Sequence, residues 1–398
     1  MKIFKFGILL IFSVLISVLV SCNDDPTSLG TDLLPDSDFL NLVHVNSKEL
    51  NLDQKAWSFT DSISTGGSSR ILLGKYGNVE SWMLIKFFYI FPDSLVSFWK
   101  DGKLTISKTW VELKPDYLLG DSVLNNFSFE VRRIKSSWSS ASFNLDSLNS
   151  LVYDAENLAG NLSFETDSLI RFDLPTEIPL LWLTGQAENS STIDKENGIL
   201  FIPNSSNMVL GFQALAEFTQ NPLPQLKIVV EKSGAFTDTL TATPTSDIHI
   251  VKGTYPKTVP GTFVLQDGLP VRAKFWIDLN KIPAKMPINK ATLTFFVNKE
   301  QSVEGSIKSD SLALYVYSDS LANKINKNYG RIILKRSSDT YTGDVTSFVQ
   351  RWINGIANEG IRINLTDESR ALSKIVLYSN EAADTSKRPL LEIDYIKK

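Results

Sequence analysis

Apolar and polar residues alternate along most of the chain beyond about residue 45. Phe127, Phe129 and Val131 alternate with polar residues, and 361–365 repeats the pattern. A period of two places one face of a strand in a core and the other in water, which is typical of antiparallel sheets. Short strands between Gly, Pro, Asn and Asp turns predict an all-β protein built from sandwiches.

One segment has a helical period instead. Between Asp344 and Gly360 the apolar residues recur every three or four positions: Val345, Phe348, Val349, Trp352, Ile353 and Ile356. Asp344 is placed as an N-cap and Gly360 as the stop. The pattern predicts one short amphipathic helix that lies across the edge of a sandwich.

The second half of the chain repeats the first. Asn358-Glu359-Gly360-Ile361 matches Glu196-Asn197-Gly198-Ile199, and Lys274-Phe275 matches Lys86-Phe87. The offset between matched positions is larger at Leu104 and Leu293 than at Gly198 and Gly360. The first copy is therefore expected to contain an insertion between Ser107 and Thr184.

The repeat predicts two tandem, jelly-roll-like antiparallel β-sandwiches, each with at most one short helix. We place the first over 46–232 and the second over 233–398. Pro175 and Pro179 lie in the segment that mirrors the helix, so we expect a shorter or irregular helix in the first copy.

The N-terminus predicts where the protein works. Lys2 and Lys5 precede an apolar run over 7–20, which is typical of a secretory signal peptide. Ser21-Cys22 resembles the lipobox of bacterial lipoproteins, in which the cysteine is acylated. Cys22 is the only cysteine in the chain, and lipidation gives a reason for it. The alternatives are a retained signal anchor, for which the run is short, or an ordinary signal peptide with a chance cysteine.

Residues 1–21 are then the signal peptide and 22–45 a flexible, lipidated tether. The acidic residues directly behind Cys22 resemble the export tag that carries lipoproteins to the outer face of the outer membrane. An anchor that faces the periplasm is the alternative. We expect membrane lipid to hold the protein through the acyl chains on Cys22.

Composition argues against nucleic acid as a partner and offers few catalytic groups. The formal charge is −4, and no basic stripe overrides it. His44 and His249 are the only histidines and lie far apart in sequence, which does not favour a metal site or a triad. No Gly-x-Ser-x-Gly elbow occurs, so we expect no enzyme and no cofactor. Structural calcium at Asp-rich loops is the one ion we consider.

Three aromatic residues are candidates for stacking against sugar rings, namely Trp138 in a serine-rich loop, Tyr329 and Tyr341. Each has a structural alternative, as a lid over its own sheet. Four other tryptophans are expected in the core: Trp82, Trp182, Trp276 and Trp352.

Several segments of the second copy together resemble a DNRLRE domain: 273–277, 288–293, 344–355, 360–361 and 379–393. The resemblance covers most of the second copy and, more faintly, the first. It implies a jelly-roll sandwich of the kind found in bacterial surface and secreted proteins, some of which bind uronic-acid polymers. No Lys and Arg cluster for polysaccharide matches, so sugar binding is implied by the family alone.

These observations favour a membrane-anchored, non-enzymatic surface lipoprotein that binds extracellular glycan or mediates adhesion. The alternative is a structural or docking subunit of an outer-envelope protein assembly. A further alternative is a polysaccharide hydrolase or lyase, since 44 acidic residues leave paired carboxylates open.

Overall fold

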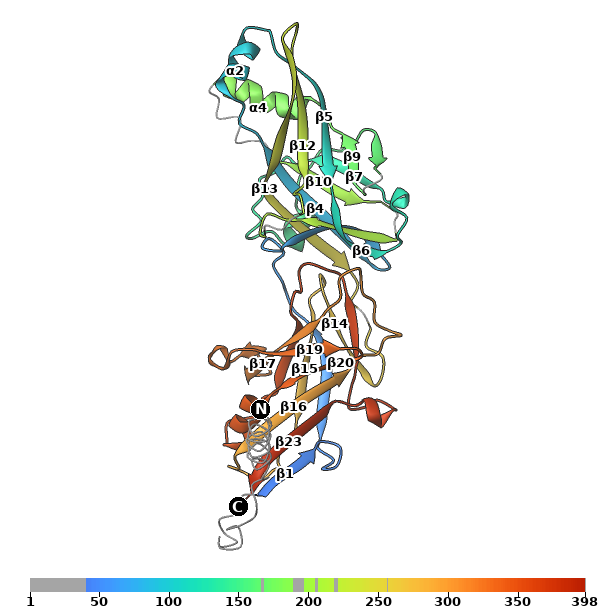
Figure 1. Cartoon of the computed structure of the whole chain (residues 1–398), viewed down its shortest axis with the longest axis vertical. Coiled ribbons are helices and arrows are strands. Elements are labelled where there is room, and N and C mark those ends of the chain that lie inside the picture. Colours follow the sequence, from blue (N-terminus) through green and yellow to red (C-terminus); the bar gives the residue numbers. More distant parts are fainter. Residues whose placement is uncertain are drawn as a thin grey trace, which may run out of the picture.

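The computed structural model describes residues 41–165, 168–188, 197–204, 207–217, 221–255 and 257–397. They form two antiparallel β units arranged along the long axis of the molecule (Figure 1). The prediction of an all-β protein with two sandwich units is confirmed. Cys22 and most of the predicted tether lie outside the described residues.

The lower unit in Figure 1 contains residues 41–60 and 262–397. Its described strands are β1 (Asn41–Asn46), β2 (Gln54–Thr60), β14 (Thr262–Gln266), β15 (Val271–Ile277), β16 (Ile288–Phe296), β17 (Ser311–Asp319), β18 (Lys324–Ile325), β19 (Ile332–Ser337), β20 (Thr340–Asp344), β21 (Ile361–Leu365), β22 (Lys374–Tyr378) and β23 (Leu390–Lys397). They pair in the order β1-β23-β16-β20-β19-β17-β21-β15-β14-β22, with β2 on β15 and β18 on β17. The core includes Phe275, whose ring meets Phe295 edge to face at 5.1 Å.

The upper unit contains residues 70–253. Its described strands are β3 (Arg70–Tyr76), β4 (Val79–Phe88), β5 (Thr105–Leu113), β6 (Pro115–Gly120), β7 (Phe129–Arg133), β8 (Leu162–Phe164), β9 (Ile170–Asp173), β10 (Ile199–Pro203), β11 (Met208–Gln213), β12 (Gln225–Lys232) and β13 (Phe236–Gly253). They pair in the order β6-β11-β3-β4-β13-β12-β5-β9-β8, and β10 bridges β4 and β7. Trp182 is buried in this core, as predicted.

The predicted domain boundaries are wrong, because the chain enters the lower unit first, passes into the upper unit and then returns to the lower one. β1 pairs with β23 and β2 with β15, so 41–60 belongs to the lower unit and not to the tether and first domain. β13 pairs with β12 and β4, so it belongs to the upper unit although it follows the predicted boundary at 232/233. The upper unit is thus inserted between β2 and β14 of the lower unit.

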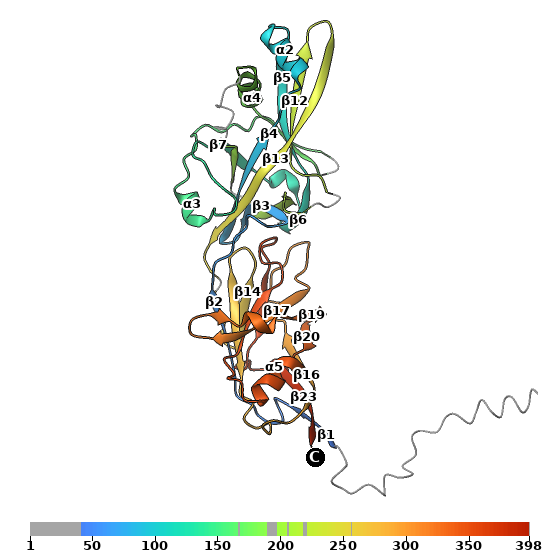
Figure 2. The ribbon, with the colours of Figure 1, turned by 90° about the vertical axis from the view of Figure 1, so that its left-hand side faces the viewer.

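Strand neighbours support the predicted repeat. The trio β12, β5, β9 matches β23, β16, β20, and the pair β10, β4 matches β21, β15. In the upper unit the single strand β13 occupies the place that β1 and β2 share in the lower unit. Figure 2 shows β13 running along most of the upper unit.

The predicted helix of the second copy exists but is shorter. α5 (Thr346–Ile353) begins where the Thr346 N–H donates to the Asp344 carboxylate at 2.8 Å. It ends before Gly355, which has φ 96°, and not at Gly360. Gly360 has a different reason to be glycine, because a Cβ there would lie 2.7 Å from the Phe275 carbonyl oxygen on β15.

The upper unit has more helix than predicted. Its described residues include α2 (Asp93–Lys100), α3 (Leu145–Asn149) and α4 (Glu177–Ala187), so the limit of one short helix is wrong there. α4 is also longer than α5, contrary to our expectation. Pro175 precedes α4 and Pro179 lies in its first turn, where main-chain N–H groups have no helical partner to lose.

Within the described part of the chain, no helix is long and apolar enough to cross a membrane.

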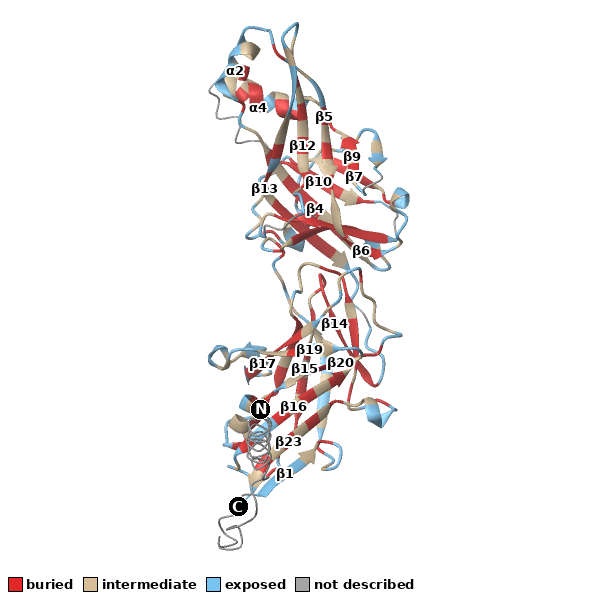
Figure 3. Ribbon diagram, viewed as in Figure 1, coloured by how far each residue is buried: buried red, intermediate tan, exposed pale blue. Residues whose placement is uncertain are grey.

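The two units meet in a packed junction. A small apolar cluster contains residues of both units: Leu72, Tyr117, Leu119, Val209 and Val251 above, and Leu269, Ala371 and Leu372 below. The Leu372 N–H donates to the Tyr117 hydroxyl at 3.2 Å, and the Ser306 N–H donates to the Leu118 carbonyl at 2.7 Å. Figure 3 shows buried residues in the strands of both units, whereas α2 and β1, at opposite ends, consist mainly of exposed and half-buried residues. The units are therefore joined by packing as well as by two chain crossings.

Candidate binding face

The aromatic residues predicted as sugar platforms lie in separate places. Trp138 is half-buried in the upper unit, where its indole N–H donates to the Asn197 carbonyl at 2.7 Å. Its ring meets Phe143 edge to face at 5.9 Å. Both rings belong to the segment that covers the outer face of β4, β10 and β13. Trp138 is thus placed as a lid over its own sheet, the alternative that the sequence left open.

The two tyrosines lie in the lower unit. Tyr341 on β20 is fully buried, and its hydroxyl donates to the Ser309 carbonyl at 2.5 Å. Burial raises the pKa of Tyr341, and the ring cannot serve as an exposed platform, so that prediction is wrong. Tyr329 in the 3-10 turn η5 (Lys327–Tyr329) is half-buried, with the Arg351 guanidinium 4.0 Å from its ring centre.

The two histidines do not come together. His44 on β1 forms a 2.6 Å hydrogen bond with Asp394, which raises the pKa of His44. His249 is buried in the upper unit, and neither ring nitrogen has a hydrogen-bond partner among the described residues. In the same part of the chain, no group of three or more His, Cys, Asp or Glu residues could hold a metal ion.

A different set of residues forms a row on the outer face of the lower unit. Trp57 on β2 lies opposite Lys274 on β15, Lys274 opposite Arg362 on β21, and Arg362 opposite Tyr315 on β17. Directly opposed residues of antiparallel strands point to the same side of a sheet. Aromatic rings therefore stand at the two ends of the row, with two cations between them.

We call this surface the β15 face. Its members are Lys55, Trp57, Phe59, Arg272, Lys274, Trp276, Tyr315, Tyr317 and Arg362. Neighbouring rings and cations are in contact: the Lys274 ammonium lies 5.3 Å from the Phe59 ring centre and 5.2 Å from that of Tyr317. The Arg362 guanidinium lies 4.9 Å from the Tyr315 ring centre. Cation–π contacts of this kind hold both partners in defined positions.

Carboxylates orient the arginines of the β15 face. Arg272 donates to Glu368 through Nε at 2.9 Å and Nη2 at 2.7 Å, and it also bonds Asp61. Arg362 has weaker support, because its Nη1 lies 4.0 Å from Asp61 and its Nε has no partner in the described chain. Burial, followed by the nearby Arg272, lowers the pKa of Arg362. Trp57 remains 45% exposed at the edge of this set.

The equivalent face of the upper unit is closed. Leu84 on β4 lies opposite Leu200 on β10, as Lys274 on β15 lies opposite Arg362 on β21, so the two leucines stand where the lower unit has these two cations. Leu84 and Leu200 are fully buried, because α3 and the loop around Phe143 pack over them. This covering segment lies inside the range predicted for the insertion. In the lower unit the corresponding face is basic and aromatic. Lys55 and Trp57 are exposed on it, Tyr317 is buried, and the other members of the β15 face are half-buried.

The comparisons with known proteins do not identify the chain. No family model matches it, and no curated protein matches it. Among solved structures it is similar to the Streptococcus agalactiae AgI/II polypeptide BspA C terminal domain, at 9% identity over 83% of this chain and 90% of that one. The TM-score is 0.12, which is too low to indicate a shared fold.

Proposed function

We propose that the protein is a lipid-anchored, non-enzymatic surface protein that binds extracellular glycan through the β15 face. The row from Trp57 to Tyr315 carries this proposal. Exposed rings stack on the apolar faces of sugars, and flanking cations bind hydroxyl or acidic substituents. Four neighbouring strands span about 14 Å, which suits a short oligosaccharide.

The anchor completes the proposed function. Acylation of Cys22 would hold the chain in the outer membrane, with the described residues presented outside. Because β1 is the first described strand and belongs to the lower unit, the β15 face lies in the unit nearer to the anchor along the chain. The upper unit then stands farther out and extends the molecule.

The binding step is tested by retention on immobilised polysaccharides. We expect Trp57→Ala and Lys274→Ala to weaken retention about tenfold each, since each removes a contact of about 1 kcal/mol or more. Trp110→Ala is the matched control: this ring on β5 of the upper unit also has a lysine, Lys108, 5.6 Å from its centre. Equal retention of all three variants and the unchanged protein would refute the assignment.

The anchoring step is tested separately by Cys22→Ser. We expect the variant to leave the membrane fraction while its unfolding midpoint stays unchanged. Membrane association that persists in this variant would contradict the lipoprotein proposal. It would not bear on the proposed binding of glycan at the β15 face.

A docking role is the second candidate. Ile90 is 71% exposed and Leu181 on α4 is 46% exposed, and both belong to the end of the upper unit where α2 and α4 lie (Figure 2). If this end contacts an envelope protein, crosslinking should capture a partner with the unchanged protein and lose it with Ile90→Ser and Leu181→Ser combined.

A further inference from the structure

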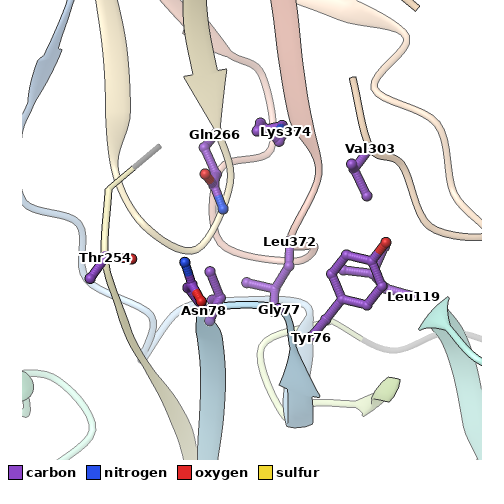
Figure 4. Close-up of a pocket in the computed structure, with 10 residues that line it drawn as sticks. Tyr76, Gly77, Asn78, Leu119, Thr254, Gln266, Val303, Leu372 and Lys374 are labelled. Atoms are coloured by element: carbon purple, nitrogen blue, oxygen red, sulfur yellow. The ribbon is translucent and has the colours of Figure 1, made fainter. Parts of the chain in front are cut away.

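A pocket of about 230 Å³ lies at the junction of the two units (Figure 4). The upper unit contributes the turn between β3 and β4 together with Leu119, and Thr254 follows directly after β13. The lower unit contributes Gln266, Val303, Leu372 and Lys374. None of these residues belongs to the β15 face, so the pocket is a separate site.

The polar side chains of the pocket have unused hydrogen-bonding capacity. Gln266 is 5% exposed, and in Figure 4 its amide points from β14 toward the Asn78 amide in the β3–β4 turn. Lys374 is the cross-strand neighbour of Gln266. Among the described residues, the side chains of Gln266, Asn78 and Lys374 have no hydrogen-bond or ion-pair partner. These residues line the pocket, where water bound to their polar groups can be replaced by a ligand.

Charge and size limit what the pocket can hold. Lys374 is the only charged residue among its described lining residues, so the ligand should carry a negative charge. Leu119, Val303 and Leu372 give it an apolar wall. Gln266 and Leu372 are buried, whereas Asn78 and Thr254 are exposed, so the pocket opens on the side of the turn. Its volume is below the roughly 300–1,000 Å³ of drug-sized sites.

We propose that the junction pocket binds a small hydroxylated carboxylate, about the size of one six-membered ring. Its carboxylate pairs with Lys374. Its hydroxyls bond the amides of Gln266 and Asn78, which can both donate and accept. Its CH groups lie against Leu372 and Val303. Because the ligand contacts both units, its binding stabilises the junction and with it the extended shape.

A free sugar acid and the terminal residue of an acidic glycan share this chemistry. The full chain in detergent is therefore titrated with D-glucuronate, D-gluconate and an acidic oligosaccharide, with D-glucose as the uncharged control. Thermal unfolding reports binding, since a ligand at a hundred times its Kd raises Tm by about 3 °C in a chain of this size. Saturation-transfer NMR confirms contact with the probe.

We expect at least one acid to raise Tm and D-glucose to have no effect. Lys374→Met should abolish the shift, and Gln266→Leu should weaken binding about tenfold. Lys374→Arg keeps the charge and should retain a partial shift, which separates lost binding from failure to fold. Lys335→Met, at an exposed lysine of β19, is the matched control and should behave as the unchanged chain.

The proposal is overturned if none of the acids raises Tm, if D-glucose acts as well as the acids, or if Lys374→Met keeps the full shift. A shift with the oligosaccharide alone would assign the site to a glycan end. Trp57→Ala should retain the shift, so failure at the pocket and failure at the β15 face can be told apart.

Discussion

The guanidinium of Arg70 connects the two units. Within the upper unit it donates to the Asp116 carboxylate through Nε at 2.6 Å and Nη2 at 3.1 Å. Its Nη1 donates to the main-chain carbonyl of Arg370, in the lower unit, at 3.1 Å. Both side chains of the ion pair are only 10% exposed. One buried arginine, bonded through each of its three guanidinium nitrogens, therefore spans the junction.

Arg70→Met should destabilise the protein by about 3 kcal/mol, because it leaves Asp116 buried without its cation. Urea unfolding measures the loss. Lys103→Met is the control: it breaks the exposed pair with Asp101, which is 51% exposed, and should change stability by less than about 0.5 kcal/mol. If the two variants are equally stable, Arg70 does not support the junction.

His249 should make the protein sensitive to acid. Burial lowers its pKa from 6.5 to about 3, so the unfolded chain binds the proton more readily than the folded one. The contribution of neutral His249 to the free energy of unfolding is fully present above pH 6.5 and is lost as the pH falls toward 3. We therefore compare the free energy of unfolding of His249→Leu with that of the unchanged protein. The difference should be about 2–3 kcal/mol more favourable to the variant at pH 4.5 than at pH 7.5. Unfolding midpoints at the two pH values test this, and parallel pH profiles would contradict it.

Asp247, two residues earlier on β13, should act in the opposite sense. Burial raises its pKa to about 6, although the Leu215 N–H donates to it at 2.8 Å. The folded state then holds the proton more tightly than the unfolded chain. The resulting contribution to the free energy of unfolding is fully present below pH 3.8 and is lost as the pH rises through 6. Asp247→Asn keeps an acceptor and should gain about 1–3 kcal/mol at pH 7.5 but little at pH 4. Lower stability of the variant at pH 7.5 would count against this reasoning.

Trp138→Ala should affect stability and not glycan binding. The ring packs on Phe143 over the closed face of the upper unit, so its removal should cost about 2 kcal/mol. Retention on polysaccharide should match that of the unchanged protein. Weakened retention in this variant, at a temperature where it stays folded, would restore Trp138 as a binding residue.

Local patterns in the sequence predicted local structure well. Alternation over 271–277 predicts β15, and its inward residues are buried as expected. The same alternation places Arg272, Lys274 and Trp276 together on the other side. We expected Trp276 in the core because it flanks the segment that matches between the two copies. It is only half-buried, with the Lys55 ammonium 5.5 Å from its ring centre. The signal for the β15 face was present, but the strands that extend it are distant in sequence.

The order of the units could not be predicted in the same way. A period of two identifies a strand but not its partner, which depends on long-range packing. The predicted boundary at 232/233 falls instead at the tight turn that joins β12 to β13, where Gly234 has φ 69°. Consecutive strands joined by a short turn usually pair, and that preference was the signal for placing β13 in the upper unit.

The insertion of one unit into the other determines how the molecule responds to tension. A pull applied at Asn41 and resisted by the upper unit is transmitted through β1 and β2. β1 would have to slide along β23, and β2 along β15. The load then falls in shear on all hydrogen bonds of both ladders at once, instead of opening them one at a time. The pairing of β1 with β23 and of β2 with β15, which the predicted domain boundaries missed, therefore lets the lower unit resist extension of the chain.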